Sequence, residues 1–142
     1  ELYAEKISLI KKLIPHCCIG VDVITGFPGE SDDDFNETVD FLKQTDVSYL
    51  HVFTYSERAN TYALNIKPVI PVNIRNQRTK ILRNLSYKKL QEFTWHHNGE
   101  KRKVLFESQN KNNMMEGYTD NYIKVTAPYK AALVNNIIDY TL

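Results

Sequence analysis

The sequence has 142 residues, of which 42% are hydrophobic and 25% are charged, values typical of a globular protein with one ordinary domain or two small ones. No apolar run approaches the length that crosses a bilayer, and no signal peptide begins the chain, so we expect a cytoplasmic protein without a membrane partner. The net charge is only +1, but the two halves of the chain differ in sign.

Acidic residues concentrate in the first half of the chain and basic residues in the second. Residues 1–66 hold 5 Lys and Arg against 11 Asp and Glu, whereas residues 67–142 hold 13 against 6. Half of all the basic residues fall between Arg75 and Lys103. This asymmetry favours an anionic partner for the second half, and a solvated helix face is the equally favoured alternative.

The chain starts in the middle of a helical pattern. The first residues lack an initiator Met, which suggests a piece cut from a longer protein. An apolar stripe over residues 1–14 predicts a helix, and Pro15 ends it because proline restricts the residue before it. The adjacent Cys17 and Cys18 point apart along the backbone, so we expect them to pack at the start of a strand rather than to form a disulfide or bind a metal.

A strand, a glycine turn and a capped helix follow one another over residues 19–44. Ile19–Ile24 is an apolar, β-branched run, and Gly26-Phe-Pro-Gly29 ends it. Ser31 and Asp34 form a capping-box pattern at the start of a helix near Asp32–Gln44. The apolar stripe of that helix is Phe35, Val39 and Leu42. In parallel α/β folds such a junction lies on the face where ligands bind, and a plain connecting turn is the alternative.

A second strand is expected over Tyr49–Tyr55, with its rings on one face and its aliphatic side chains on the other. The order helix, strand, helix, strand predicts that the two strands pair in parallel. Residues 56–71 are irregular, and a loop of that length inside a compact domain is often functional. A long helix near Val72–His97 follows, and Asn98-Gly99 ends it. Basic residues are expected to cover the sides of this helix away from its apolar stripe: Arg75, Arg78, Lys80, Arg83, Lys88 and Lys89.

The composition changes at Gly99 to short runs between turn residues. Strands are expected within Lys103–Phe106, Asn121–Thr126 and Ala132–Thr141, and this pattern predicts a small β-barrel or sandwich. Basic residues enter the first of these runs, and tyrosines alternate with lysines further on. Small barrels of that composition bind single-stranded RNA, and the equally favoured alternative is that the tyrosines are core and strand-pair residues.

No arrangement of residues in the sequence indicates catalysis. There is no Ser-His-Asp arrangement, Walker loop or Cys-x-x-Cys pair. His51 is the one histidine within an expected strand, and a packed histidine is a more frequent state than a catalytic base. The first 98 residues therefore offer a face for a ligand but no reactive group on it.

Four segments, taken together and in their order, are specific for one enzyme family. The first is Val21-Asp-Val-Ile-Thr-Gly-Phe-Pro-Gly-Glu-Ser, and the second is Tyr49-Leu-His-Val-Phe-Thr-Tyr-Ser-Glu-Arg-Ala-Asn-Thr. They resemble the fifth strand, and the sixth strand with its following loop, of radical S-adenosylmethionine methylthiotransferases, with Asn60 where that loop usually has Gly. Val104-Leu-Phe-Glu and Glu116-Gly-Tyr-Thr-Asp-Asn-Tyr-Ile-Lys-Val resemble the TRAM domain, the small RNA-binding β-barrel at the C-terminus of this family.

The resemblance covers nearly the whole chain and implies a fold and an activity. It implies the C-terminal part of a TIM-type (β/α) barrel in residues 1–98 and an antiparallel, OB-like TRAM barrel in residues 99–142. The segment from Gly117 to Val125 is most similar to the branch that adds a methylthio group to N6-threonylcarbamoyladenosine next to the anticodon in tRNA. The isopentenyladenosine branch and a branch that modifies a ribosomal protein are the alternatives within the family. An RNA-binding module without its own catalysis is the alternative of another class.

By the same resemblance, the full-length parent uses S-adenosylmethionine and two [4Fe-4S] clusters, one of them held by Cys-x3-Cys-x2-Cys. Because that motif is absent from this chain, we expect the fragment to bind none of these groups, to hold no catalytic residue or metal ligand, and to be inactive alone. Its expected partners are tRNA, the N-terminal domains of the same protein, and a second copy of the fragment paired through exposed strand edges.

The resemblance also implies two sets of site residues. The residues expected to shape the S-adenosylmethionine pocket, with Glu30 bracing its turn, are Gly26, Gly29, Glu30, Phe53, Thr54, Tyr55 and Arg58. The residues expected to bind RNA are Lys101, Arg102, Lys103, Tyr118, Tyr122 and Lys124.

Overall fold

The computed structural model of the chain describes residues 2–109 and 112–142. The chain forms two compact units, of which unit 1 is Glu1–Pro15 with Ile19–Gln91 and unit 2 is His16–Cys18 with Glu92–Leu142. The assignment of residues 1–98 and 99–142 to two named domains stays a prediction. A search of the described residues finds no helix whose length and apolarity would let it cross a membrane.

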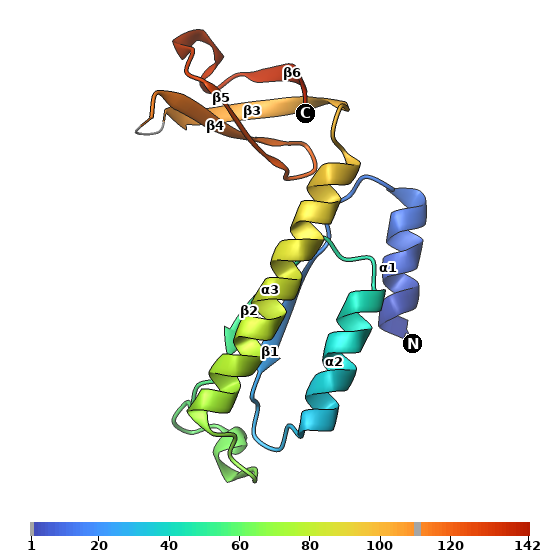
Figure 1. Cartoon of the computed structure of the whole chain (residues 1–142), viewed down its shortest axis with the longest axis vertical. Coiled ribbons are helices and arrows are strands. Elements are labelled where there is room, and N and C mark those ends of the chain that lie inside the picture. Colours follow the sequence, from blue (N-terminus) through green and yellow to red (C-terminus); the bar gives the residue numbers. More distant parts are fainter. Residues whose placement is uncertain (1, 110–111) are drawn as a thin grey trace. The chain divides into compact units, whose positions relative to one another are not determined.

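Unit 1 consists of helices and, among its described residues, two strands that pair in parallel (Figure 1). Its elements are α1 (Leu2–Leu13), β1 (Gly20–Thr25), α2 (Asp32–Gln44), β2 (Tyr49–Thr54), the 3-10 helix η1 (Tyr62–Asn65) and α3 (Val72–His96), whose last residues belong to unit 2. Val21 lies opposite Leu50 in the parallel register, so the predicted parallel pairing is confirmed. Two paired strands do not establish the (β/α) barrel that the resemblance implies, so the barrel stays a prediction.

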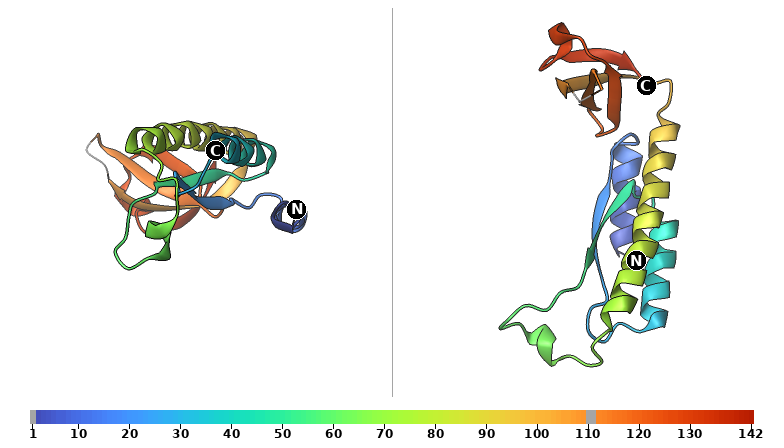
Figure 2. Two further views of the ribbon diagram at one scale, coloured as in Figure 1. Left: turned by 90° about the horizontal axis from the view of Figure 1, so that it is seen from below. Right: turned by 60° about the vertical axis from the view of Figure 1, so that its left-hand side comes forward.

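The helices of unit 1 cover one face of the β1–β2 sheet (Figure 2). Leu50 and Val52 of β2 are buried on this face and join one core cluster with Leu82 of α3. On the opposite face Ile24 is 57% exposed and Phe53 is 54% exposed. The predicted division of β2 into two faces is therefore confirmed, and the uncovered face carries apolar side chains.

Helix α2 begins and ends where its local sequence predicts. The Ser31 hydroxyl accepts a hydrogen bond from the Asp34 amide at 3.0 Å, and the Asp34 carboxylate accepts one from the Ser31 amide at 2.9 Å. The Ser31 hydroxyl also donates to the Asp34 carboxylate at 2.7 Å, and this bond, together with the one from the Ser31 amide, holds the pKa of Asp34 below its usual value. The residues that α2 buries are those of the predicted stripe: Phe35, Val39 and Leu42.

Side chains of α3 cover the edge of β2 that does not face β1. Ser86 Oγ accepts from the Leu50 amide at 2.8 Å and donates to the Leu50 carbonyl at 2.9 Å. Arg83 Nη2 lies 3.5 Å from the Val52 carbonyl oxygen on the same edge. A second chain would need these backbone groups in order to extend the sheet. The predicted homodimer through strand edges is therefore not supported at this edge.

Unit 2 contains a four-stranded antiparallel sheet within the described part of the chain, in the order β5-β4-β3-β6. Its elements after α3 are β3 (Lys101–Gln109), β4 (Met114–Thr119), β5 (Lys124–Pro128), the 3-10 helix η2 (Ala131–Leu133) and β6 (Ile137–Thr141). One side of the sheet forms a core around Val104, Phe106 and Met115. The expectation of short antiparallel strands after Gly99 is confirmed.

The predicted strand boundaries in unit 2 differ from the structure at four places. β3 runs from Lys101 to Gln109 and so extends beyond the predicted run Lys103–Phe106 at both ends. β4 was not expected, because Met114–Thr119 contains one β-branched residue and a glycine. β5 begins only at Lys124, because the residues from Asn121 form a turn. Only the last part of the predicted run Ala132–Thr141 is a strand, because Ala131–Leu133 forms η2.

Candidate functional sites

The first candidate site is the turn that follows the carboxyl end of β1. Gly26 has φ +73° and Gly29 has φ +88°, which is the left-handed region that glycine enters without strain. A Cβ on Gly26 would also lie 2.4 Å from Arg75 Cγ, so a side chain has no room there. Both the local backbone and its surroundings therefore require glycine at position 26.

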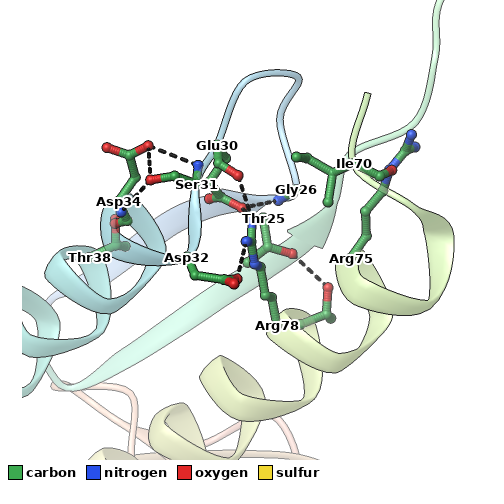
Figure 3. Close-up of polar contacts among 11 residues, drawn as sticks. Thr25, Gly26, Glu30, Ser31, Asp32, Asp34, Thr38, Ile70, Arg75 and Arg78 are labelled. Carbon is green, nitrogen blue, oxygen red and sulfur yellow. Dashed lines mark hydrogen bonds and ion pairs between the residues drawn. The ribbon is translucent and has the colours of Figure 1, made fainter. Parts of the chain in front are cut away.

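Glu30 and Arg78 brace this turn (Figure 3). The Gly26 amide donates to Glu30 Oε2 at 2.7 Å, and Arg78 Nη1 donates both to that carboxylate and, at 3.0 Å, to the Glu30 carbonyl. Arg78 Nη2 donates to Asp32 Oδ1 at 2.7 Å. Because Arg78 is only 5% exposed, its charge is removed from water and depends on these acceptors.

Arg75 makes the corresponding contacts at the carboxyl end of β2. Its guanidinium donates to the Ile70 carbonyl at 2.7 Å, to the Tyr55 carbonyl at 3.2 Å and to the Glu57 carboxylate at 2.6 Å. It also lies over the Tyr55 ring, 5.3 Å from the ring centroid. The bond to Glu57 raises the pKa of Arg75 and lowers the pKa of Glu57. One helix therefore positions the loops that follow both strands.

The prediction that these two arginines lie on the exposed side of α3 is wrong. Arg75 and Arg78 are 3% and 5% exposed. They precede the buried Leu82 by seven and four residues, and this spacing places all three on one helical stripe. That spacing was the available signal, but carbonyl and carboxylate groups far away in the sequence decide whether arginine can be buried there.

A buried threonine cluster joins both strands to α3. The Thr79 hydroxyl lies 2.7 Å from the hydroxyls of Thr25, at the end of β1, and Thr54, at the end of β2. The side chain of Thr54 therefore points to the helix side of the sheet. Thr54 was predicted to shape a cofactor pocket, but only its backbone can contact a ligand on the uncovered face.

The other predicted pocket residues are placed differently from one another. Phe53 lies on the uncovered face, and the Tyr55 ring packs edge-on against Phe27 with centroids 5.3 Å apart. The buried Tyr55 hydroxyl has no hydrogen-bond partner among the described residues. Arg58 is exposed in the loop after β2. The structure thus brings Gly26, Glu30 and Tyr55 together at the strand ends, whereas the Arg58 side chain forms no hydrogen bond or ion pair with any of these described residues.

Aromatic rings are exposed near these strand ends, since Phe27 is 42% exposed and Phe53 is 54% exposed, and an exposed ring can stack on a flat ligand. A search of the described residues finds no group of three or more His, Cys, Asp or Glu side chains that could hold a metal.

The second candidate site is on the outer face of the sheet in unit 2. The strand registers align four outward side chains across the sheet: Ile137, Leu105, Tyr118 and Lys124. A groove of about 580 Å³ lies beside this row and is lined by Leu105, Glu107, Tyr118, Thr119, Asp120 and Tyr122. A smaller hollow of about 210 Å³ shares several of these residues and adds Lys103 and Ile137.

Two of the predicted RNA-binding cations are engaged within the protein. Arg102 donates to Glu100 and Asp120, each at 3.0 Å, and its side chain is only 11% exposed. Lys124 is paired with Glu116 at 2.7 Å, which raises the pKa of Lys124. The structure therefore places Tyr118 and Tyr122 in the lining of the groove and Lys103 in the lining of the smaller hollow. The remaining predicted residues lie outside both linings: Lys101, Arg102 and Lys124.

The turn between β4 and β5 holds Tyr122 at the rim of the groove. The Thr119 carbonyl accepts from the Tyr122 amide at 3.0 Å, and the Thr119 hydroxyl accepts from the Ile123 amide at 2.8 Å. Asn121 accepts from the same hydroxyl at 2.6 Å. In this turn Tyr122 has φ +63° and is 75% exposed.

Known proteins similar to this chain modify tRNA. It is 41% identical over 125 residues, 88% of its length, to the "Threonylcarbamoyladenosine tRNA methylthiotransferase MtaB" of Aquifex aeolicus. It is 34% identical over 142 residues to the Bacillus subtilis protein of the same name, and 32% identical over 142 residues to the "tRNA-2-methylthio-N(6)-dimethylallyladenosine synthase" of Desulfitobacterium hafniense. The chain spans 29%, 32% and 31% of the lengths of these three proteins. No protein-family model matches the chain.

Proposed function

We propose that this chain, a homologue of the tRNA methylthiotransferases, forms part of an enzyme that adds a methylthio group to N6-threonylcarbamoyladenosine next to the anticodon in tRNA. The observation that carries the proposal is the 41% identity over 88% of the chain to a protein named for that reaction. Two further relatives with the same name are 34% and 36% identical over 97% and 93% of the chain.

In this proposal unit 1 supplies one wall of the S-adenosylmethionine site. The uncovered face with Ile24 and Phe53 would be the inner surface of a (β/α) barrel whose other strands lie outside these 142 residues. Gly26 and Glu30 would then form the rim against which the nucleoside rests, because ligands of such barrels bind at the carboxyl ends of the strands. Arg75 and Arg78 would position that rim without touching the ligand.

The iron-sulfur clusters of such an enzyme do not fit the residues of this chain. Its two cysteines are adjacent, and its described residues contain no group of three or more possible metal ligands. A cluster supplies the electron that cleaves S-adenosylmethionine to a radical, so this chemistry would be located outside unit 1 and unit 2. The role proposed for this chain is to hold the cofactor and the tRNA.

Unit 2 would be the tRNA-binding TRAM domain of the enzyme. It presents two exposed tyrosines, Tyr118 on β4 and Tyr122 in the turn after β4, and Lys103 lines the adjacent hollow. Rings that stack on bases and lysines that meet phosphates are the groups that small β domains use on RNA.

The test is to produce the full-length protein that contains this chain in a bacterial strain that lacks the modification, and to analyse the tRNA nucleosides by mass spectrometry. We expect N6-threonylcarbamoyladenosine to gain one methylthio group, and the empty vector serves as the control. The proposal fails if the nucleoside stays unmodified although the purified protein contains its clusters.

The dimethylallyladenosine reaction is a second candidate. Relatives named for it are 31–34% identical to the chain. A methylthio group on that nucleoside alone would favour this candidate. A protein that binds tRNA but modifies neither nucleoside would instead favour an RNA-binding module without its own catalysis.

A further inference from the structure

The groove of unit 2 presents two aromatic rings to solvent. Tyr118 is 41% exposed on β4, and Tyr122 is 75% exposed in the turn after it. Both line the groove of about 580 Å³, together with the side chain of Leu105. A groove of that size can take one flat heterocycle between rings, whereas folding gains little from a ring that stays in water.

The backbone of Tyr122 is also in a conformation that its residue type disfavours. A bulky residue with φ +63° is strained, whereas asparagine or glycine occupies this region readily. The turn itself is fixed by the bonds of Thr119, which need no ring at position 122. A tyrosine at this position therefore costs stability, and its ring is free to contact a ligand.

The charge of the groove selects the part of a nucleic acid that can enter it. Among the described residues, its lining contains Glu107 and Asp120 but no Lys or Arg. Asp120 Oδ1 is bonded to Arg102, while no described residue bonds to the Glu107 carboxylate. Carboxylates repel phosphate and accept hydrogen bonds from the amino groups of bases.

We infer that this groove holds one unpaired nucleobase that carries an exocyclic amino group, stacked on Tyr122 and Tyr118 and bonded to the Glu107 carboxylate. The inference rests on the proposed role of unit 2 in binding tRNA and specifies how the RNA is held. The backbone of the RNA then passes beside the groove, where Lys103 lines the adjacent hollow.

The first experiment measures binding of the 142-residue chain to fluorescein-labelled heptamers, three uridines on each side of a variable central position. Adenine, cytosine, guanine, uracil or an abasic sugar occupies the centre, and fluorescence anisotropy gives Kd. We expect the amino-bearing bases to bind fivefold to a hundredfold more tightly than the abasic heptamer, the ratio that corresponds to about 1–3 kcal/mol of stacking. Uracil should bind between these limits. Equal binding of all five heptamers overturns the inference, and it is also the result expected if the groove docks a protein.

The second experiment separates a ligand role of Tyr122 from a structural one. Tyr122→Asn should lose the advantage of the amino-bearing bases over the abasic heptamer, while its thermal unfolding midpoint stays equal or rises because asparagine suits the backbone. Tyr122→Phe keeps a ring and should bind as the unchanged chain does. Glu107→Gln should reduce the preference over uracil but keep the preference over the abasic sugar. Tyr87→Leu, on the exposed side of α3, is the matched control and should change neither ratio.

The two proposals can fail separately. A full-length protein that methylthiolates its nucleoside while the chain binds all heptamers equally retains the proposed function and overturns the groove assignment. The opposite result is also possible. If the chain prefers amino-bearing bases through Tyr122 but the full-length protein modifies no nucleoside, the groove assignment is retained and the proposed function is overturned.

Discussion

Gly26 is the residue at which local backbone geometry and tertiary packing impose the same requirement. Its φ of +73° strains most residues that carry a Cβ, and that Cβ would overlap the side chain of Arg75 near its attachment to α3, where the side chain cannot rotate away. Gly99 has φ +84° but has no atom within 4 Å of such a Cβ. Comparing substitutions at the two glycines therefore separates the free-energy cost of backbone strain from the cost of the clash with Arg75.

Gly26→Ala should lower the free energy of unfolding by about 2–5 kcal/mol, the sum of backbone strain and overpacking. Gly99→Ala introduces backbone strain alone and should lower the free energy of unfolding by about 1 kcal/mol. Urea titrations followed by circular dichroism measure both values. Equal costs would show that Arg75 moves aside easily and that α3 does not hold the turn rigidly.

Single residues also show where sequence analysis succeeds and where it fails. The glycines and the Ser31–Asp34 capping box were predictable, because a turn and a helix start depend on residues within a few positions of each other. Arg75 and Arg78 were not, because their partners Tyr55 and Glu30 are 20 and 48 positions away. Arginine is almost never buried unless paired, and the sequence does not display the pairs.

At the scale of elements, α3 stabilises β2 through polar contacts as well as through its apolar side. Ser86 satisfies both backbone groups of Leu50 on the strand edge. Ser86→Ala leaves those groups without a partner and should lower the free energy of unfolding by about 1–3 kcal/mol. Ser56→Ala, in the exposed loop after β2, is the matched control and should stay within about 0.5 kcal/mol of the unchanged chain. A cost for Ser86→Ala as small as the control would mean that water replaces the hydroxyl at this edge.

Elements differ in how far their own residues determine them. α2 was predicted to its ends because a cap and an apolar stripe lie within the segment. β4 was missed, since its extended state depends on pairing with β3 and since its Gly117 belongs to a residue type that is depleted in strands. The structure explains that glycine, because a Cβ on Gly117 would lie 2.3 Å from the Leu105 carbonyl oxygen of the paired strand. The close approach of two backbones that are distant in the sequence is a feature of tertiary structure, so it cannot be predicted from the local composition.

For the molecule as a whole, the fold itself uses part of the basic charge of its second half. Arg75 and Arg78 neutralise acidic side chains of unit 1, and Arg102 does so within unit 2. The sequence therefore overstates how much positive charge is available to an anionic partner. Lys101 and Lys103 of β3 are exposed, and no described residue forms an ion pair with either of them.

This distribution predicts which side chains set the salt dependence of tRNA binding, if unit 2 binds tRNA as proposed. Each lysine that meets a phosphate releases counterions, so Lys101→Gln and Lys103→Gln should each reduce the slope of log K against log salt by about 0.7–0.9. Arg102→Gln should leave that slope unchanged but lower the unfolding midpoint, because Glu100 and Asp120 lose their partner. Binding measured between low and moderate potassium chloride for the three variants tests this division. A slope that falls with Arg102→Gln but not with Lys103→Gln would mean that the ion pairs open on RNA and that the phosphates run along the other side of β3.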